Sequence, residues 1–159
     1  MKSQPVLDLP KSSVETWLDA ASLLFITLGF AFAIGYYTDL PDQIPTHYNA
    51  SGDPDRFGAK ISIFFLPVLS LLLIGGLVFL AKYPHQFNYL TTITPQNAAF
   101  EYRKARTLIR MMNVLVSLLF TSITWHTIQT STGGQGKLGL WFGILVAATV
   151  IMPLVVLFG

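Results

Sequence analysis

Residues 41–60, PDQIPTHYNASGDPDRFGAK, bring together a histidine, three aspartates, an arginine and a lysine. The first chemistry that this set suggests is cation binding. Carboxylate oxygens suit calcium, and an added imidazole suits zinc or manganese. Within the segment the candidate ligands are His47, Asn49, Asp53 and Asp55. A zinc site would form if His47 and one carboxylate, Asp55 or Asp53, converged with the distant His126. The spacing matches no standard metal-binding loop.

Two other interpretations of this segment stay open. In one, it forms a polar lid that recognises an external peptide or lipid. In the other, Asp–Arg and Asp–Lys pairs merely hold a cap closed. The candidate recognition residues are Pro45, His47, Asn49, Gly52, Asp53, Asp55, Arg56 and Lys60.

Catalysis has weaker support in the sequence. Ser51 lies close to His47, but proximity in a turn-rich segment is not a nucleophile–base geometry. The sequence contains no Gly-x-Ser-x-Gly, His-Glu-x-x-His or phosphate-loop motif. It also lacks cysteine, which excludes thiolate nucleophiles and disulfides. We therefore expect a protein that is not an enzyme and that has no cofactor.

The elements that must position this segment follow from composition. Of the 159 residues, 52% are hydrophobic and only 11% are charged, against roughly 25% charged in an average soluble domain. Four apolar runs each approach the ~20 residues that a helix needs to cross a bilayer. We therefore predict an all-α membrane protein, a single domain over 1–159, with spans at about 18–37, 61–81, 107–128 and 138–158.

Lysine and arginine predict the orientation of these spans. Seven lie before the first span, between the second and third, or just inside the third, against three in the other two connections (Arg56, Lys60 and Lys137). Both termini and the 82–106 connection should then be cytoplasmic, with the 38–60 loop outside. We expect no cleaved signal peptide, because charged residues precede the first apolar run without a small-residue cleavage site. The net charge of +2 is too small and scattered to favour nucleic acid.

Local signals refine the connections. The prolines and glycines make regular structure unlikely over 41–58, so we predict an ordered but irregular outer loop. Thr94 resembles a helix N-cap followed by Pro95 at the first helical position, and from there a helix could continue to about Thr127. Within the third span, Ser117, Thr121 and Thr124 share one face, which should point into the bundle. Gly139 and Gly143 form a GxxxG pair, a motif that permits close helix approach.

The outer segment also resembles a known signature. LPDQIPTHYNASGDPDRFGAK is similar to the pattern of the bacterial SdpI-type membrane proteins, roughly proline, Ile-Pro-x-His-Phe/Tyr-Asn, Gly-x-Pro-Asp, an aromatic residue and a lysine. A second block, YPHQFNYLTTITPQNAAFEYRKAR, resembles the cytoplasmic connection of that family. The matching residues in this block are Asn88, Tyr89, Thr94, Asn97 and Tyr102.

The resemblance implies a function without assigning chemistry to any residue. The N-terminal module of that family is catalogued as a domain of unknown function. The founding member, which has further spans, protects a cell against a secreted toxic peptide and holds a repressor at the membrane. We therefore expect a multi-pass protein of the bacterial inner membrane that recognises or neutralises an external peptide or an envelope stress. The alternative is a small accessory or assembly subunit, with a partner membrane subunit or a homodimer. Membrane lipids are expected partners and nucleic acid is not.

Overall fold

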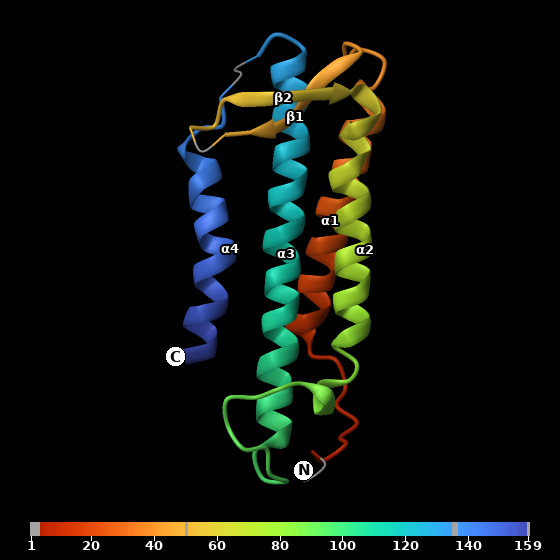
Figure 1. Cartoon of the computed structure of the whole chain (residues 1–159). Helices are drawn as coiled ribbons and strands as arrows, with labels where there is room; N and C mark the ends of the chain where they lie inside the picture. Colours follow the sequence, from red (N-terminus) through yellow and green to blue (C-terminus); the bar gives the residue numbers. More distant parts are fainter. Residues whose placement is uncertain (1–3, 50, 135–136, 159) are drawn as a thin grey trace.

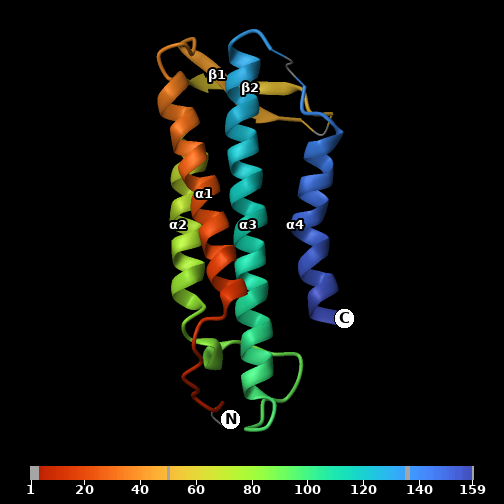
Figure 2. The ribbon, with the colours of Figure 1, turned by 180° about the vertical axis from the view of Figure 1, so that it is seen from behind.

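Long helices lie side by side in the computed structural model, which describes residues 4–49, 51–134 and 137–158 (Figure 1). In chain order the elements are α1 (Ser13–Tyr36), β1 (Gln43–Tyr48), β2 (Pro54–Ala59), the 3-10 helix η1 (Lys60–Phe64), α2 (Phe65–Leu80), the 3-10 helix η2 (Pro84–Gln86), α3 (Ala98–Ser131) and α4 (Leu140–Phe158). Helices α1 and α3 run toward the strands, whereas α2 and α4 run back (Figures 1 and 2). We call the end that carries the strands the hairpin end and the opposite end the N-terminal end.

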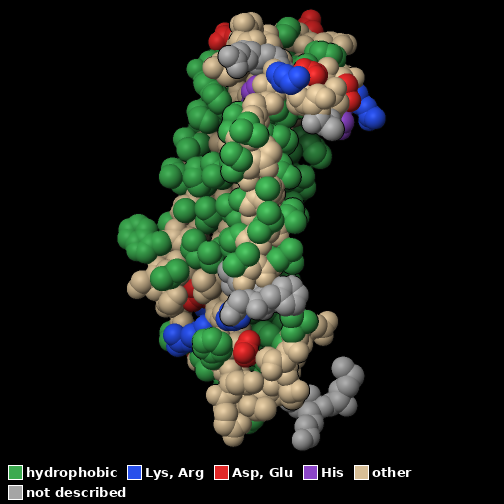
Figure 3. All heavy atoms as spheres, turned by 90° about the vertical axis from the view of Figure 1, so that its left-hand side faces the viewer, with side chains coloured by type: hydrophobic (Ala, Val, Ile, Leu, Met, Phe, Trp, Pro, Cys, Tyr) green, Lys and Arg blue, Asp and Glu red, His purple; other side chains and the backbone are tan. Residues whose placement is uncertain are grey.

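The lengths and apolar character of the helices confirm a membrane protein. Three helical segments are long and apolar enough to cross a bilayer: Ser13–Tyr36, Lys60–Leu80 and Ala98–Ser131. The fourth, α4, is also apolar, over the shorter stretch Leu140–Val155. Hydrophobic side chains cover the middle of the molecule, and charged ones gather at its two ends (Figure 3). The side of the membrane that each end faces stays a prediction.

The predicted irregular loop is wrong, because residues 43–48 and 54–59 pair as the two strands of an antiparallel β-hairpin. An all-α class is therefore wrong in this part of the chain. Proline is tolerated at the first residue of a strand and beside bulges. Pro54 begins β2, and Pro45 lies next to an irregularity in the register between Pro45 and His47. The same prolines that argued against a strand thus occupy the positions that a strand permits.

The starts of α1 and α3 also differ from the prediction. Helix α1 begins five residues before the predicted span, because Ser12 and Glu15 form a reciprocal capping box. Helix α3 begins at Ala98, with Asn97 rather than Thr94 at the N-cap. The peptide N–H of Thr94 donates to Asn97 Oδ1 instead, at 2.8 Å, and residues 94–98 form a turn.

The buried face of α3 is mostly polar. The predicted inward face is confirmed, since Ser117, Thr121 and Thr124 are all buried. The hydroxyl of Thr121 donates to the carbonyl of Phe25 at 2.7 Å, which joins α3 to α1. A Cβ on Gly29 would lie 3.2 Å from the same hydroxyl oxygen, so glycine permits this close approach. Hydrophobic core residues gather instead at the hairpin end, at Ala33, Leu40, Ile44, Ile63 and Ile128.

Candidate functional site

Asn49 and Gly52 build the turn of the hairpin. The side-chain oxygen of Asn49 accepts the peptide N–H groups of Ser51 and Asp53, at 2.9 and 3.0 Å. Gly52 has φ +81°, and its carbonyl accepts the N–H of Leu138 at 2.8 Å. A Cβ at Gly52 would lie 2.6 Å from the Leu138 carbonyl oxygen. Both residues therefore serve the shape of the cap, and Gly52 fastens it to the segment that leads into α4.

Pro45 and Lys60 also have structural positions. Pro45 is buried beside Ile44, which belongs to the apolar cluster at the hairpin end. The ammonium of Lys60 lies 5.4 Å from the ring centroid of Tyr37 and donates to the carbonyl of Leu40. Lys60 thereby ties the end of β2 to the end of α1.

The side chains of His47, Asp55 and Arg56 are left on the exposed surface of the hairpin. His47 Nδ1 lies 2.6 Å from Asp55 Oδ1, with 54% and 39% of the two side chains exposed. Asp53, by contrast, pairs with Lys137 at 3.3 Å, across the connection between α3 and α4. Thus the structure brings His47 and Asp55 together on one face and uses Asp53 as a second contact between the cap and the α3–α4 connection.

The candidate zinc ligands His47, Asp55 and His126 do not form a three-ligand group in the described part of the chain. Among the described residues there is no group of three His, Asp or Glu side chains that could hold a metal ion. His126 packs instead between the rings of Tyr48 and Trp141, with centroid distances of 5.5 and 6.3 Å. The hydroxyl groups of Tyr48 and Thr127 lie at hydrogen-bond distance, 3.3 Å. The ring of Tyr48 therefore lies between α3 and the His47–Asp55 pair.

A cavity of about 660 Å³ lies between α1, α3 and the start of α4. Its apolar lining includes Phe25, Leu28, Phe32 and Leu118, whereas His126, Gln129 and Lys137 line the part that belongs to the hairpin end. The cavity therefore changes from apolar to polar toward the hairpin and could accept an amphipathic molecule.

The second sequence block lies at the N-terminal end, where it holds the chain against α3. Tyr89 donates to the carbonyl of Pro84 at 2.9 Å, and Tyr102 donates to that of Pro5 at 2.8 Å. Burial, followed by the proximity of Tyr102 and Glu101, raises the pKa of Tyr89 above its ordinary value. The amide of Asn97 donates to Thr92. Among the block's matched residues, Asn88 and Tyr89 line a second cavity at this end.

Sequence reasoning missed a buried ionic cluster at the same end. Glu15, which is 1% exposed, accepts from Arg106 at 2.8 and 3.1 Å and pairs with Arg110 at 3.1 Å. Arg110 also contacts Asp19 at 3.1 Å, and Lys11 reaches Asp19 at 2.6 Å. The usable signal was the four-residue spacing within each pair, which places Glu15 with Asp19 on one face of α1 and Arg106 with Arg110 on one face of α3.

Comparison with known proteins gives a partial family match. Residues 24–71 match the family described as "Domain of unknown function (DUF1648)". This range contains the second half of α1, the whole hairpin and the first half of α2. An uncharacterized protein from Archaeoglobus fulgidus is 24% identical over 168 aligned positions, which cover 97% of this chain and 88% of the relative. No solved structure matches the chain. The expected similarity to a domain of unknown function is thus supported, whereas the SdpI-type assignment stays a prediction.

Proposed function

We propose that this membrane protein binds an external peptide at the hairpin end and thereby senses it or protects the membrane from it, without catalysing a reaction. The observation that carries the proposal is the free edge of β2. Among the described residues β2 pairs only with β1, whereas β1 also contacts α3 and η1. An exposed strand edge can accept an extended peptide as an additional strand.

The rigidity of the hairpin supports a binding role. The Asn49 turn, the Gly52–Leu138 hydrogen bond and the Lys60 contacts fix the cap before any ligand arrives. Binding to a pre-organised surface avoids the entropic cost of ordering it. The resemblance to the SdpI-type signature falls on this same segment. The expected location is the bacterial inner membrane, with the hairpin on the outer side.

The exposed side chains indicate which peptides would fit. Phe57 is 58% exposed on β2, and an aromatic side chain of this kind is a common anchor in interfaces. Around the hairpin, four carboxylates stand against three cations (Asp39, Asp42, Asp53 and Asp55; Arg56, Lys60 and Lys137). This balance favours an extended peptide of net positive charge. The edge of β2 is short and charged, which disfavours pairing between copies of the chain itself.

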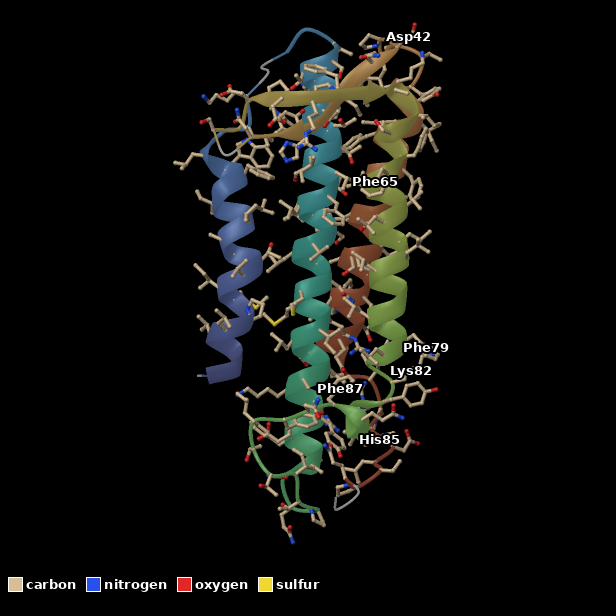
Figure 4. The ribbon with its side chains drawn as sticks, in the orientation of Figure 1. Asp42, Phe65, Phe79, Lys82, His85 and Phe87 are labelled. Carbon is tan, nitrogen blue, oxygen red and sulfur yellow. The ribbon has the colours of Figure 1, made fainter. Side chains whose placement is uncertain are left out.

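The test is a protection assay in cells that express the chain. Cells with and without it are exposed to a panel of secreted cationic membrane-active peptides, and the dose that halves growth is measured. We expect the chain to raise this dose for at least one peptide, and Phe57→Ala to reduce the protection by about tenfold. The matched control is Phe79→Ala, because Phe79 is 59% exposed at the far end of α2 (Figure 4). Equal growth with and without the chain across the panel would contradict the proposal.

A second candidate function is that of an accessory subunit in a larger membrane assembly. The observation that favours it is the position of the GxxxG pair. A Cβ on Gly143 would meet no atom within 4 Å, so this glycine is not used for packing against the described part of the bundle. Purification in mild detergent separates the two functions. A stoichiometric partner that is lost on Gly143→Leu supports the subunit role, and a lone chain with intact protection supports peptide binding.

A further inference from the structure

A second cavity, larger than the one beside α4, lies at the N-terminal end and has no part in the proposed peptide binding. It has a volume of about 840 Å³ and lies between the end of α2, the 86–91 segment and the first turns of α3. Figure 4 shows Phe87 and Lys82 in this region, where the connection crosses in front of α3. Some residues of its wall belong to the connection predicted to be cytoplasmic, and others belong to the predicted membrane spans.

One part of this cavity is apolar. Leu77 comes from the last turn of α2, and Leu108 and Met112 come from α3. At 1.5 Å per residue, the stretch of α3 from Lys104 to Met112 extends about 12 Å. This surface is apolar and is long enough to contact the part of a lipid acyl chain that lies nearest the headgroup.

The other part carries two opposite charges that form no ion pair within the described part of the chain. Glu101 and Lys104 both line the cavity and are half-buried, three residues apart on one face of α3. Among the described residues neither side chain makes an ion pair or a hydrogen bond. The cluster around Glu15 nearby has its charges paired. Partly desolvated charges without partners are unfavourable, so these two favour a ligand that supplies the complementary charges.

The arrangement of an apolar floor and two opposite charges specifies the ligand class. A free phosphate would satisfy Lys104 but leave the apolar floor empty. An anionic lipid such as phosphatidylglycerol would place its negative headgroup beside Glu101. Choline offers no N–H to the Glu101 carboxylate, whereas a primary ammonium can donate a charge-assisted hydrogen bond to it.

We propose that this cavity binds a phospholipid of the phosphatidylethanolamine class. The lipid phosphate accepts from the Lys104 ammonium, the lipid ammonium donates to the Glu101 carboxylate, and an acyl chain follows Leu108 and Met112. Asn88, Tyr89 and Gln86 form the polar border on the side of the connection. Such a lipid would hold the 86–91 segment against α3 at the headgroup level.

The test measures lipid binding to the purified full chain in detergent by native mass spectrometry. Phosphatidylethanolamine, phosphatidylcholine and phosphatidylglycerol with identical acyl chains are added in turn. We expect the ethanolamine lipid to bind about tenfold more tightly than the other two. Glu101→Gln should remove its advantage over phosphatidylcholine, and Lys104→Gln should weaken the binding of all three lipids. The matched control is Arg103→Gln, because Arg103 is exposed on the same turn and does not line the cavity.

A variant that fills the cavity provides a test independent of charge. Met112→Trp should abolish retention of the ethanolamine lipid while the thermal unfolding of the lipid-free protein changes little. Equal affinity for the three lipids in the unaltered chain would overturn the proposal. So would unaltered selectivity for phosphatidylethanolamine in Glu101→Gln and Lys104→Gln together. Neither result bears on the peptide-binding proposal, whose residues lie at the other end.

Discussion

The two ends of the bundle hold their charged residues in opposite ways. At the N-terminal end, Glu15 and Arg110 are almost fully buried in one shared cluster. At the hairpin end, His47 and Asp55 form a pair that is largely open to solvent. Removing one member of a buried cluster leaves an uncompensated charge, whereas exposed pairs contribute little to stability. We therefore expect a substitution in the buried cluster to cost far more stability than one in the exposed His47–Asp55 pair.

The largest expected effect is the loss of the buried carboxylate. Glu15→Gln leaves Arg106 and Arg110 with less negative charge around them, and we expect the free energy of unfolding to fall by about 3–5 kcal/mol. Thermal or denaturant unfolding in detergent measures it. Asp8→Asn is the control, because Asp8 is an exposed carboxylate of the same N-terminal segment. A loss below about 1 kcal/mol would place this cluster with ordinary surface pairs and remove the contrast between the two ends.

The next effect concerns the attachment of the hairpin to α4. Gly52→Ala places a methyl group against the Leu138 carbonyl at a positive φ, so we expect a loss of about 2–4 kcal/mol. Gly133→Ala is the matched control. Gly133 has φ +96° but open space around its Cβ position, so it reports the backbone strain alone, about 1–2 kcal/mol. Hydrogen exchange at the Leu138 amide should accelerate only in the Gly52 variant. Equal losses of unfolding free energy in the two variants would mean that the contact with Leu138 does not contribute to stability.

The smallest effect on stability is expected on the exposed face of the hairpin. His47→Ala should change the free energy of unfolding by no more than about 0.5 kcal/mol, while lowering peptide protection. Gln43→Ala, a change at an exposed and uncharged residue of β1, should alter neither property. A His47 variant that unfolds easily would show that this pair belongs to the cap's structure and not to its binding face.

The helices could be predicted from the sequence because a helix that spans a bilayer requires a long run of apolar residues, which is easy to recognise. The hairpin was missed because its strands are short, and they contain proline, glycine and charge in place of an alternating hydrophobic pattern. Pro45 and Pro54 argued against strands, yet they lie where strands tolerate them. The pattern of glycines and prolines correctly marked an ordered segment without revealing its geometry.

Site residues were found by type, but their roles depended on contacts that sequence does not contain. Asn49 and Gly52 were expected to contact a ligand; the structure shows that they form the turn, and their contact with a ligand stays a prediction. His126 was considered as a metal ligand together with His47, and in the structure its ring packs against the ring of Tyr48. Arg106 and Arg110 were interpreted only as markers of the cytoplasmic side, because pairing with Glu15 requires knowing that α1 and α3 run parallel at matching depth.

Peptide binding requires that the hairpin end face the outside of the cell, where a peptide can reach it. Because the chain contains no cysteine, single cysteines at Ser51 and Ser3 can be labelled one at a time with a membrane-impermeant maleimide in intact cells. We predict that Ser51→Cys reacts at once and that Ser3→Cys reacts only after the membrane is opened. Labelling of Ser3→Cys in intact cells with Ser51→Cys protected would place the hairpin in the cytoplasm, where no external peptide reaches it.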